Sequence, residues 1–138
     1  MTSPLLPALL LCLLASFTYS FTTDFVIYGM MTCSYNRPFT YQIQILEKDP
    51  ISADEKLSRS SFQTTAGSPA PYNITGKDED DGPLNHWYEI ALLVYHNCGI
   101  HHKRLKKEFY VGEYWVRHGR HTINFDFDLT DKGQIADW

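Results

Sequence analysis

The stretch from Trp87 to Cys98 constrains the fold more than any other part of the chain. It contains an unbroken apolar run from Ile90 to Tyr95 and ends in His-Asn-Cys. A strand with one face in water alternates apolar and polar residues, whereas a run without alternation is typical of a strand covered on both faces. A buried helix is the alternative, but the run is short and follows an Asp-Asp-Gly-Pro turn signal at residues 80–83. We therefore predict the central strand of an all-β domain, with Cys98 as an anchor at its end.

Other segments show the pattern of strands with one buried face. Apolar side chains fall at every second position in residues 39–45 and again in residues 123–129. Residues 25–33 form a further candidate strand with Gly29 in its interior, a common place for a bulge or a close backbone approach. We expect this strand and the one from Phe39 to form a β-hairpin or a short β-arch.

The number of strands indicates the architecture. Shorter strand candidates lie at residues 61–65, 72–76 and 108–116, while residues 47–60 and 77–83 are polar and are predicted to be loops. About seven short strands, without a helical period after residue 20, predict a β-sandwich. At 138 residues the chain has room for one such domain.

Residues 1–20 are predicted to be a signal peptide, which leaves residues 21–138 as the domain. They carry no charged side chain and contain an apolar run, Ala8 to Ala15, that is too short for a membrane span of about 20 residues. Thr18-Tyr19-Ser20 is a plausible small-x-small cleavage site, although only the α-amino group supplies the positive charge expected before the apolar run. No later segment is apolar enough to span a bilayer. We therefore predict a secreted, extracellular protein.

The cysteines support this reading. Cys12 would leave with the signal peptide, and in an oxidising compartment Cys33 and Cys98 would most simply pair with each other. The alternative is a free or intermolecular thiol at each site. The two cysteines are 65 positions apart, so the chain-entropy model assigns such a bridge roughly 4 kcal/mol.

The order of short motifs resembles the nematode transthyretin-like secreted family. The residues that carry the resemblance are Gly29 to Cys33 with Pro38, Glu47 with Asp49, Thr65 to Gly67 followed by residues 72–76, and Tyr95-His96-Asn97-Cys98. The resemblance implies a transthyretin-like (prealbumin-like) β-sandwich of seven to eight strands. It also implies a secreted protein without catalytic activity that binds extracellular or cell-surface partners. Cysteines that many members carry near residues 101–103 and 131–138 are absent here.

A basic stretch is the candidate interaction surface. It consists of Lys103, Arg104, Lys106 and Lys107, with Tyr110, Tyr114 and Trp115 nearby. Four cations this close together attract anionic glycans or anionic lipid head groups. The alternative is a solvated edge strand whose lysines discourage pairing with another sheet, or one that the acidic residues 78–81 neutralise.

Other polar residues suggest modification or no special chemistry. Asn73 begins an Asn-Ile-Thr sequon, so we predict a glycoprotein, with an unmodified strand-end asparagine as the alternative. His96, His101 and His102, with His118 and His121, could bind zinc or copper only if three or four ligands converge, and histidines beside turns are usually solvated, so we predict no metal, cofactor or catalytic residue. We expect His96 to bond a neighbouring loop instead.

These features lead to two functional hypotheses. The first is an extracellular interaction protein, not an enzyme, that binds an anionic surface or a protein partner. The second is an oligomeric carrier of a small apolar ligand, which the 3 Trp, 9 Tyr and 8 Phe residues would allow. The net charge of −4 argues against nucleic acid as a partner. Oligomeric state and the identity of the partner do not follow from the sequence.

Overall fold

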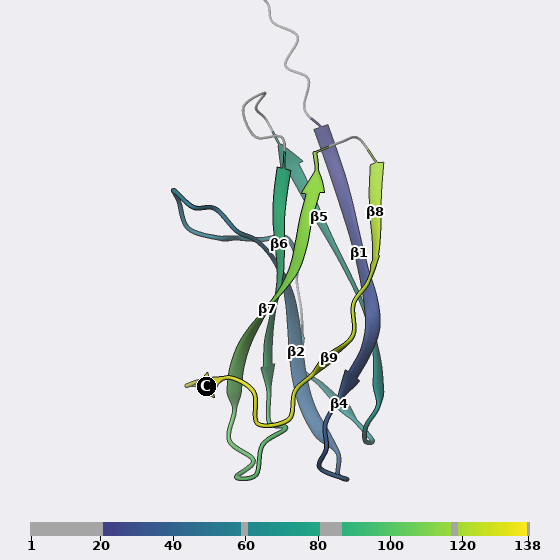
Figure 1. Ribbon diagram of the computed structural model, residues 1–138, viewed down its shortest axis with the longest axis vertical. Helices are drawn as coiled ribbons and strands as arrows, with labels where there is room; N and C mark the ends of the chain where they lie inside the picture. The colour runs from purple at the N-terminus through teal and green to yellow at the C-terminus, as the bar shows by residue number, and fades with distance from the viewer. Residues whose placement is uncertain (1–20, 59–60, 81–86, 117–118, 138) are drawn as a thin grey trace, which may run out of the picture.

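The protein is a sandwich of two β-sheets that face each other (Figure 1). The structure, a computed structural model, describes residues 21–58, 61–80, 87–116 and 119–137. In the smaller sheet the order is β5-β1-β8, and β9 also pairs with β1. Its strands are β1 (Phe21–Thr32), β5 (Ala70–Asp80), β8 (Gly119–Asn124) and β9 (Phe127–Asp128).

The larger sheet has six strands in the order β10-β7-β6-β2-β3, and β4 also pairs with β2. These strands are β2 (Phe39–Glu47), β3 (Glu55–Lys56), β4 (Gln63–Thr65), β6 (Trp87–His96), β7 (Leu105–Trp115) and β10 (Gln134–Ile135). The predicted all-β sandwich is therefore confirmed as an architecture. The described residues contain ten strands rather than the seven or eight expected, because several are two-residue pairings at the sheet margins.

The predicted central strand is confirmed as β6, which lies between β7 and β2. Its even-numbered residues from Tyr88 to His96 face the space between the sheets and are buried. Ala91 and Leu93 point to the opposite face and are also buried, where they pack with Leu46. Burial on both faces explains why this strand shows no alternation in sequence.

Several predicted boundaries were wrong. The predicted loop at residues 47–60 contains the end of β2 and all of β3. Residues 77–80, a lysine and three acidic residues, are not a loop but the end of β5, where they pair with residues 21–24 of β1. The alternating segment at the C-terminus is not one strand: β8 and β9 pair with successive parts of β1, and Phe125 lies between them. The first two strands lie in different sheets, so they form a β-arch rather than a hairpin.

Gly29 is the place where another backbone approaches β1, as its position in the sequence predicted. The Phe125 N–H donates to the Tyr28 carbonyl oxygen (2.9 Å), and the Met30 N–H donates to Asp126 Oδ1 (2.8 Å). The connection between β8 and β9 is therefore anchored on both sides of Gly29. A side chain at this position would occupy the same space as the Phe125 carbonyl.

The predicted disulfide joins Cys33 and Cys98. Cys33 follows β1 and Cys98 follows β6, so the bridge links the two sheets at one end of the sandwich. Next to it, His96 is 1 % exposed, its Nε2 lies 2.8 Å from the Lys132 carbonyl oxygen, and its Nδ1 accepts a hydrogen bond from the Cys98 N–H. Burial lowers the pKa of His96, which favours the neutral ring. His96 thus bonds a neighbouring loop, as predicted.

The predicted signal peptide, with Cys12, lies outside the described residues. Within those residues, no helix has the length and apolar character needed to cross a membrane.

Candidate interaction surface

The basic stretch does not act as one patch of four cations. Lys103, Lys106 and Lys107 are exposed, but Arg104 is 8 % exposed and its guanidinium lies 4.4 Å from the centre of the Phe62 ring. Loss of solvent lowers the pKa of Arg104. The Lys106 ammonium lies 5.8 Å from the centre of the Tyr95 ring. Arg104 therefore holds the start of β7 against a neighbouring loop, and the exposed charge of the stretch comes from the lysines.

The aromatic residues near this stretch divide between the core and the surface. Tyr114 packs inward, edge-on to the ring of Phe25 at 6.2 Å. Tyr110 and Trp115 point outward from β7 and are 59 % and 51 % exposed. Trp87, which sequence reasoning treated only as the start of β6, is 49 % exposed and lies edge-on to Trp115 at 4.9 Å. The alternation of side chains along the strand could have shown this: since Tyr88 and Ile90 face the core, Trp87 must face outward.

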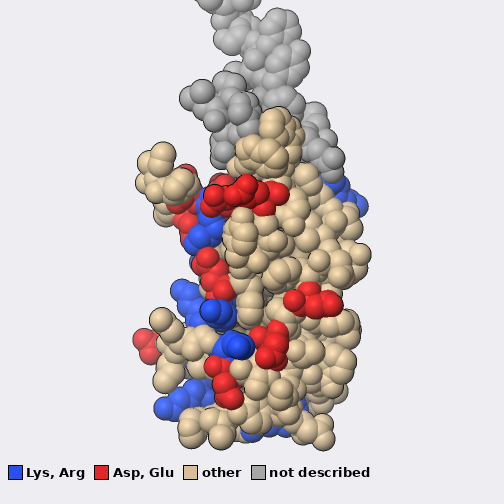
Figure 2. Space-filling view, in the orientation of Figure 1, with Lys and Arg blue, Asp and Glu red and all other residues tan. Residues whose placement is uncertain are grey.

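A cavity of about 510 Å³ lies beside this tryptophan pair. It is bordered by the end of β2 and the loop after it, by the first residues of β6, and by the end of β7. The lining residues are Glu47, Lys48, Asp49, Pro50, Ile51, Trp87, Glu89 and Glu113. In Figure 1 the β2–β3 loop projects from the sheet at this end, and in Figure 2 acidic atoms gather beside it.

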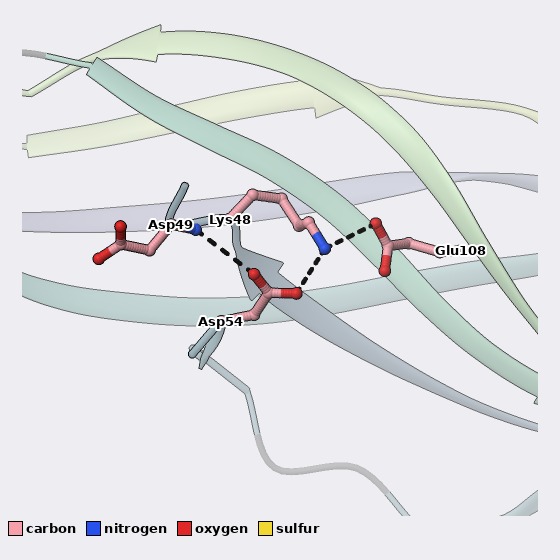
Figure 3. Close-up of polar contacts among 4 residues, drawn as sticks. All are labelled: Lys48, Asp49, Asp54 and Glu108. Atoms are coloured by element: carbon pink, nitrogen blue, oxygen red, sulfur yellow. Dashed lines mark hydrogen bonds and ion pairs between the residues drawn. The ribbon is translucent and has the colours of Figure 1, made fainter. Parts of the chain in front are cut away.

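Lys48 borders this cavity, but its ammonium group is held by carboxylates that do not line the cavity (Figure 3). It forms ion pairs with Asp54 and with Glu108, the second at 3.0 Å. Asp54 also accepts a hydrogen bond from the Asp49 N–H. Lys48 therefore fastens the β2–β3 loop to β7, and its charge is shared by carboxylates outside the cavity lining.

Two glutamates lie directly opposite each other in the cavity wall. Glu89 of β6 pairs in register with Glu113 of β7, and both side chains are exposed on the outer face. Like charges in directly opposite positions destabilise a sheet. Within the described residues, neither carboxylate forms an ion pair with Lys or Arg. A local arrangement that lowers stability is a typical mark of a functional site.

Glu47 carries a buried carboxyl group at the end of β2, on the opposite face of the sheet from Glu89, because it pairs with core-facing Ile90. It is 9 % exposed, and within the described part of the chain its carboxyl group has no hydrogen bond or ion pair. Burial is the main cause that raises the pKa of Glu47 to about 7, and the charges of Asp78, Asp49, Glu55 and Glu89 contribute to the same rise. These neighbours come from β5, the β2–β3 loop, β3 and β6, so the negative potential reaches Glu47 from several elements.

We expect the Glu47→Gln substitution to stabilise the protein above neutral pH. The unfolded carboxyl titrates near 4.5 and the folded one near 7, so the folded state binds more protons in this window and wild-type stability falls as pH rises through it. The free energy of unfolding of the variant should exceed that of wild type by about 2 to 3 kcal/mol at pH 8 and by little at pH 4.5. Urea unfolding across this pH range measures it, with Glu79→Gln as the exposed control. An equal stability difference between variant and wild type at pH 4.5 and pH 8 would show that Glu47 does not titrate in this way.

The remaining predicted sites are dispersed. Asn73 is exposed on β5, an edge strand of the smaller sheet, and its glycosylation stays a prediction. His101 and His102 are exposed, whereas His96 is buried, and His118 lies outside the described residues. Among the residues that the structure describes, no group of three or more His, Cys, Asp or Glu side chains is arranged to hold a metal ion.

Comparison with known proteins identifies relatives without a known activity. The model of a family described as "Caenorhabditis elegans protein of unknown function (DUF870)" matches residues 29–137. A Caenorhabditis elegans protein called "Uncharacterized protein B0416.7" is 29 % identical over 79 residues, which is 57 % of this chain and 58 % of that protein. The chain thus spans less than two thirds of the length of this relative. No solved structure matches the chain.

The family match corrects the resemblance to the nematode transthyretin-like family, which was wrong. The motifs that carried it have local structural roles in this protein. Gly29 admits the Phe125 backbone, His96 bonds the loop at Lys132, and Cys33 and Cys98 join the sheets. Any β-sandwich with a disulfide between its sheets can need such residues, so their order along the chain does not identify a family.

Proposed function

Because the chain belongs to the Caenorhabditis elegans family DUF870, whose function is unknown, we propose a function from its own surface. The protein is an extracellular interaction protein that binds a protein partner through the outer face of its larger sheet. The observation that carries this proposal is the group of half-exposed aromatic side chains on β6 and β7. These side chains are Trp87, Tyr110 and Trp115.

The aromatic group has the composition of a protein-binding surface. Trp and Tyr are the residues most enriched at the energetic centres of protein interfaces. Here they project from two adjacent central strands, and the buried cluster of Leu46, Ala91 and Leu93 lies on the same face. A regular sheet holds these side chains in fixed positions, so little entropy is lost when a partner binds.

The extracellular location is part of the proposal. A disulfide between buried cysteines is typical of secreted proteins. The predicted signal peptide at residues 1–20 leads to the same compartment.

The other hypotheses have weaker support. An anionic glycan or lipid head group stays a predicted partner class for Lys103, Lys106 and Lys107, but the burial of Arg104 removes one of the four cations on which it rested. An oligomeric carrier of a small apolar ligand stays a second prediction. Its channel would lie between subunits, so a monomer in light scattering would leave this hypothesis without a site.

Paired substitutions on the two outer faces test the proposal. We expect the Tyr110→Ser, Trp115→Ser double variant to bind a partner at least about tenfold more weakly than wild type. The matched control is Tyr28→Ser, Met30→Ser, which removes exposed apolar side chains (41 % and 36 %) from β1 in the smaller sheet. Wild type and both variants would be measured by surface plasmon resonance against a panel of purified nematode extracellular domains. An equal loss in the control, or no loss in the first variant, would contradict the proposal.

A further inference from the structure

We propose that the cavity between Trp87, Glu89 and Glu113 binds a cationic side chain, Lys or Arg, of the protein partner. The source of the cation rests on the proposed function, whereas the affinity of the cavity for an organic cation does not. The inference follows from the charge, the shape and the aromatic wall of the cavity.

The charge of the lining selects a cation. Glu89 and Glu113 face each other across adjacent strands, and Asp49 lies in the same lining. Lys48 also borders the cavity, but its ammonium group is held by Asp54 and Glu108. A cationic ligand placed between Glu89 and Glu113 would turn a repulsive pair into two attractive ones.

The tryptophan pair favours an organic cation over a metal ion. Trp87 lines the cavity, and the ring of Trp115 lies edge-on to the ring of Trp87 with 4.9 Å between the ring centres. An ammonium or guanidinium group over a tryptophan face gains about 0.5 to 2 kcal/mol from the ring quadrupole. By contrast, no set of three potential metal ligands is arranged for coordination within the described ranges. Guanidinium also matches carboxylates through paired N–H donors.

The volume of the cavity fits a long side chain. At about 510 Å³ it lies within the range of small-ligand pockets, roughly 300 to 1,000 Å³. Ile51, 95 % exposed on the projecting β2–β3 loop, provides an apolar contact at the rim. The aliphatic part of a Lys or Arg side chain is suited to such a contact.

A titration with a simple cation tests the cavity without the partner. We expect n-butylguanidinium chloride to shift the indole N–H signal of Trp87 in a saturable manner, in ¹⁵N-correlated NMR spectra at constant ionic strength. n-Butanol, which has the same alkyl chain without the charge, should leave this signal unchanged. The signal is assigned with Trp87→Phe. Affinity should fall as salt concentration rises, because the attraction between exposed charges is screened.

The Glu89→Gln, Glu113→Gln double variant should bind n-butylguanidinium about tenfold more weakly. Its fold should be at least as stable as wild type because a like-charge pair is removed, so the loss cannot be assigned to unfolding. Glu79→Gln, on the other sheet, removes one carboxylate outside the cavity as a control and should bind normally. Unchanged affinity in the double variant, an equal shift with n-butanol, or displacement of the cation by CaCl₂ at lower concentration would overturn the inference. None of these results depends on the partner, so the aromatic surface is judged separately by the Tyr110 and Trp115 variant.

Discussion

Replacing both Cys33 and Cys98 with alanine is expected to lower the free energy of unfolding by about 4 kcal/mol. The bridge spans 65 positions and joins the end of β1 in one sheet to the end of β6 in the other. Without it the unfolded chain gains the freedom of a large open loop, while the native strands keep their pairing. Since small domains are stable by about 5 to 15 kcal/mol, this loss would be a large share of the total.

Urea unfolding followed by tryptophan fluorescence measures this loss, with intact mass spectrometry confirming the oxidation state. Wild-type protein that has been reduced and alkylated should unfold close to the double variant, and oxidised wild type is the reference. A loss of less than about 1 kcal/mol would show that the bridge does not restrain the unfolded chain. Aggregation of the double variant at moderate temperature would agree with the expected loss of stability, because the two sheets would separate more often.

The parts of the fold that were predictable are those with one dominant cause. The central strand in Trp87 to Cys98 was predictable because a run of apolar side chains without alternation is typical of a strand covered on both faces, and the short length of the run argued against a buried helix. The disulfide followed from two cysteines in an oxidising compartment. Gly29 indicated a close backbone approach because a glycine in a strand interior otherwise weakens the strand.

The parts that were not predictable depend on tertiary pairing. Residues 77–80 are all charged, which is typical of a loop, yet they extend β5 because residues 21–24 of β1 offer a pairing edge. Arg104 was predicted to be one of four similar cations, but its contact with Phe62 brings together two segments more than forty positions apart in the sequence. Local sequence carries no signal for such contacts.

The cavity was missed for the same reason. Glu89 and Glu113 become neighbours only through the register between β6 and β7, and this register shifts at Ile90/Ala91. Gly112, opposite the shift, has a φ of 154°, which few residues other than glycine adopt. A slip of one residue would turn either glutamate to the other face. The charge pair therefore depends on a bulge that the sequence pattern alone did not locate.

Replacing Gly29 with alanine is expected to destabilise the fold by about 3 kcal/mol. A Cβ atom at this position would lie 2.2 Å from the Phe125 carbonyl oxygen and 2.7 Å from Asp126 Oδ1. The obstacle is backbone rather than a flexible side chain, and the Phe125 carbonyl also accepts a hydrogen bond from the Tyr72 hydroxyl. Relief of the clash therefore requires the β8–β9 connection to move away from β1.

The chain offers a matched control in Gly67→Ala, because no atom lies within 4 Å of a Cβ built there. We expect this variant to stay within about 0.5 kcal/mol of wild type. Urea unfolding of the two variants in parallel separates the effect of the close approach from that of adding a methyl group to a glycine. Amide hydrogen exchange should place the change at Phe125 and Met30, since both donate the hydrogen bonds that flank Gly29. Equal stability of the two variants would mean that β8 and β9 cross β1 elsewhere, and the parallel pairing on which the smaller sheet rests would have to be revised.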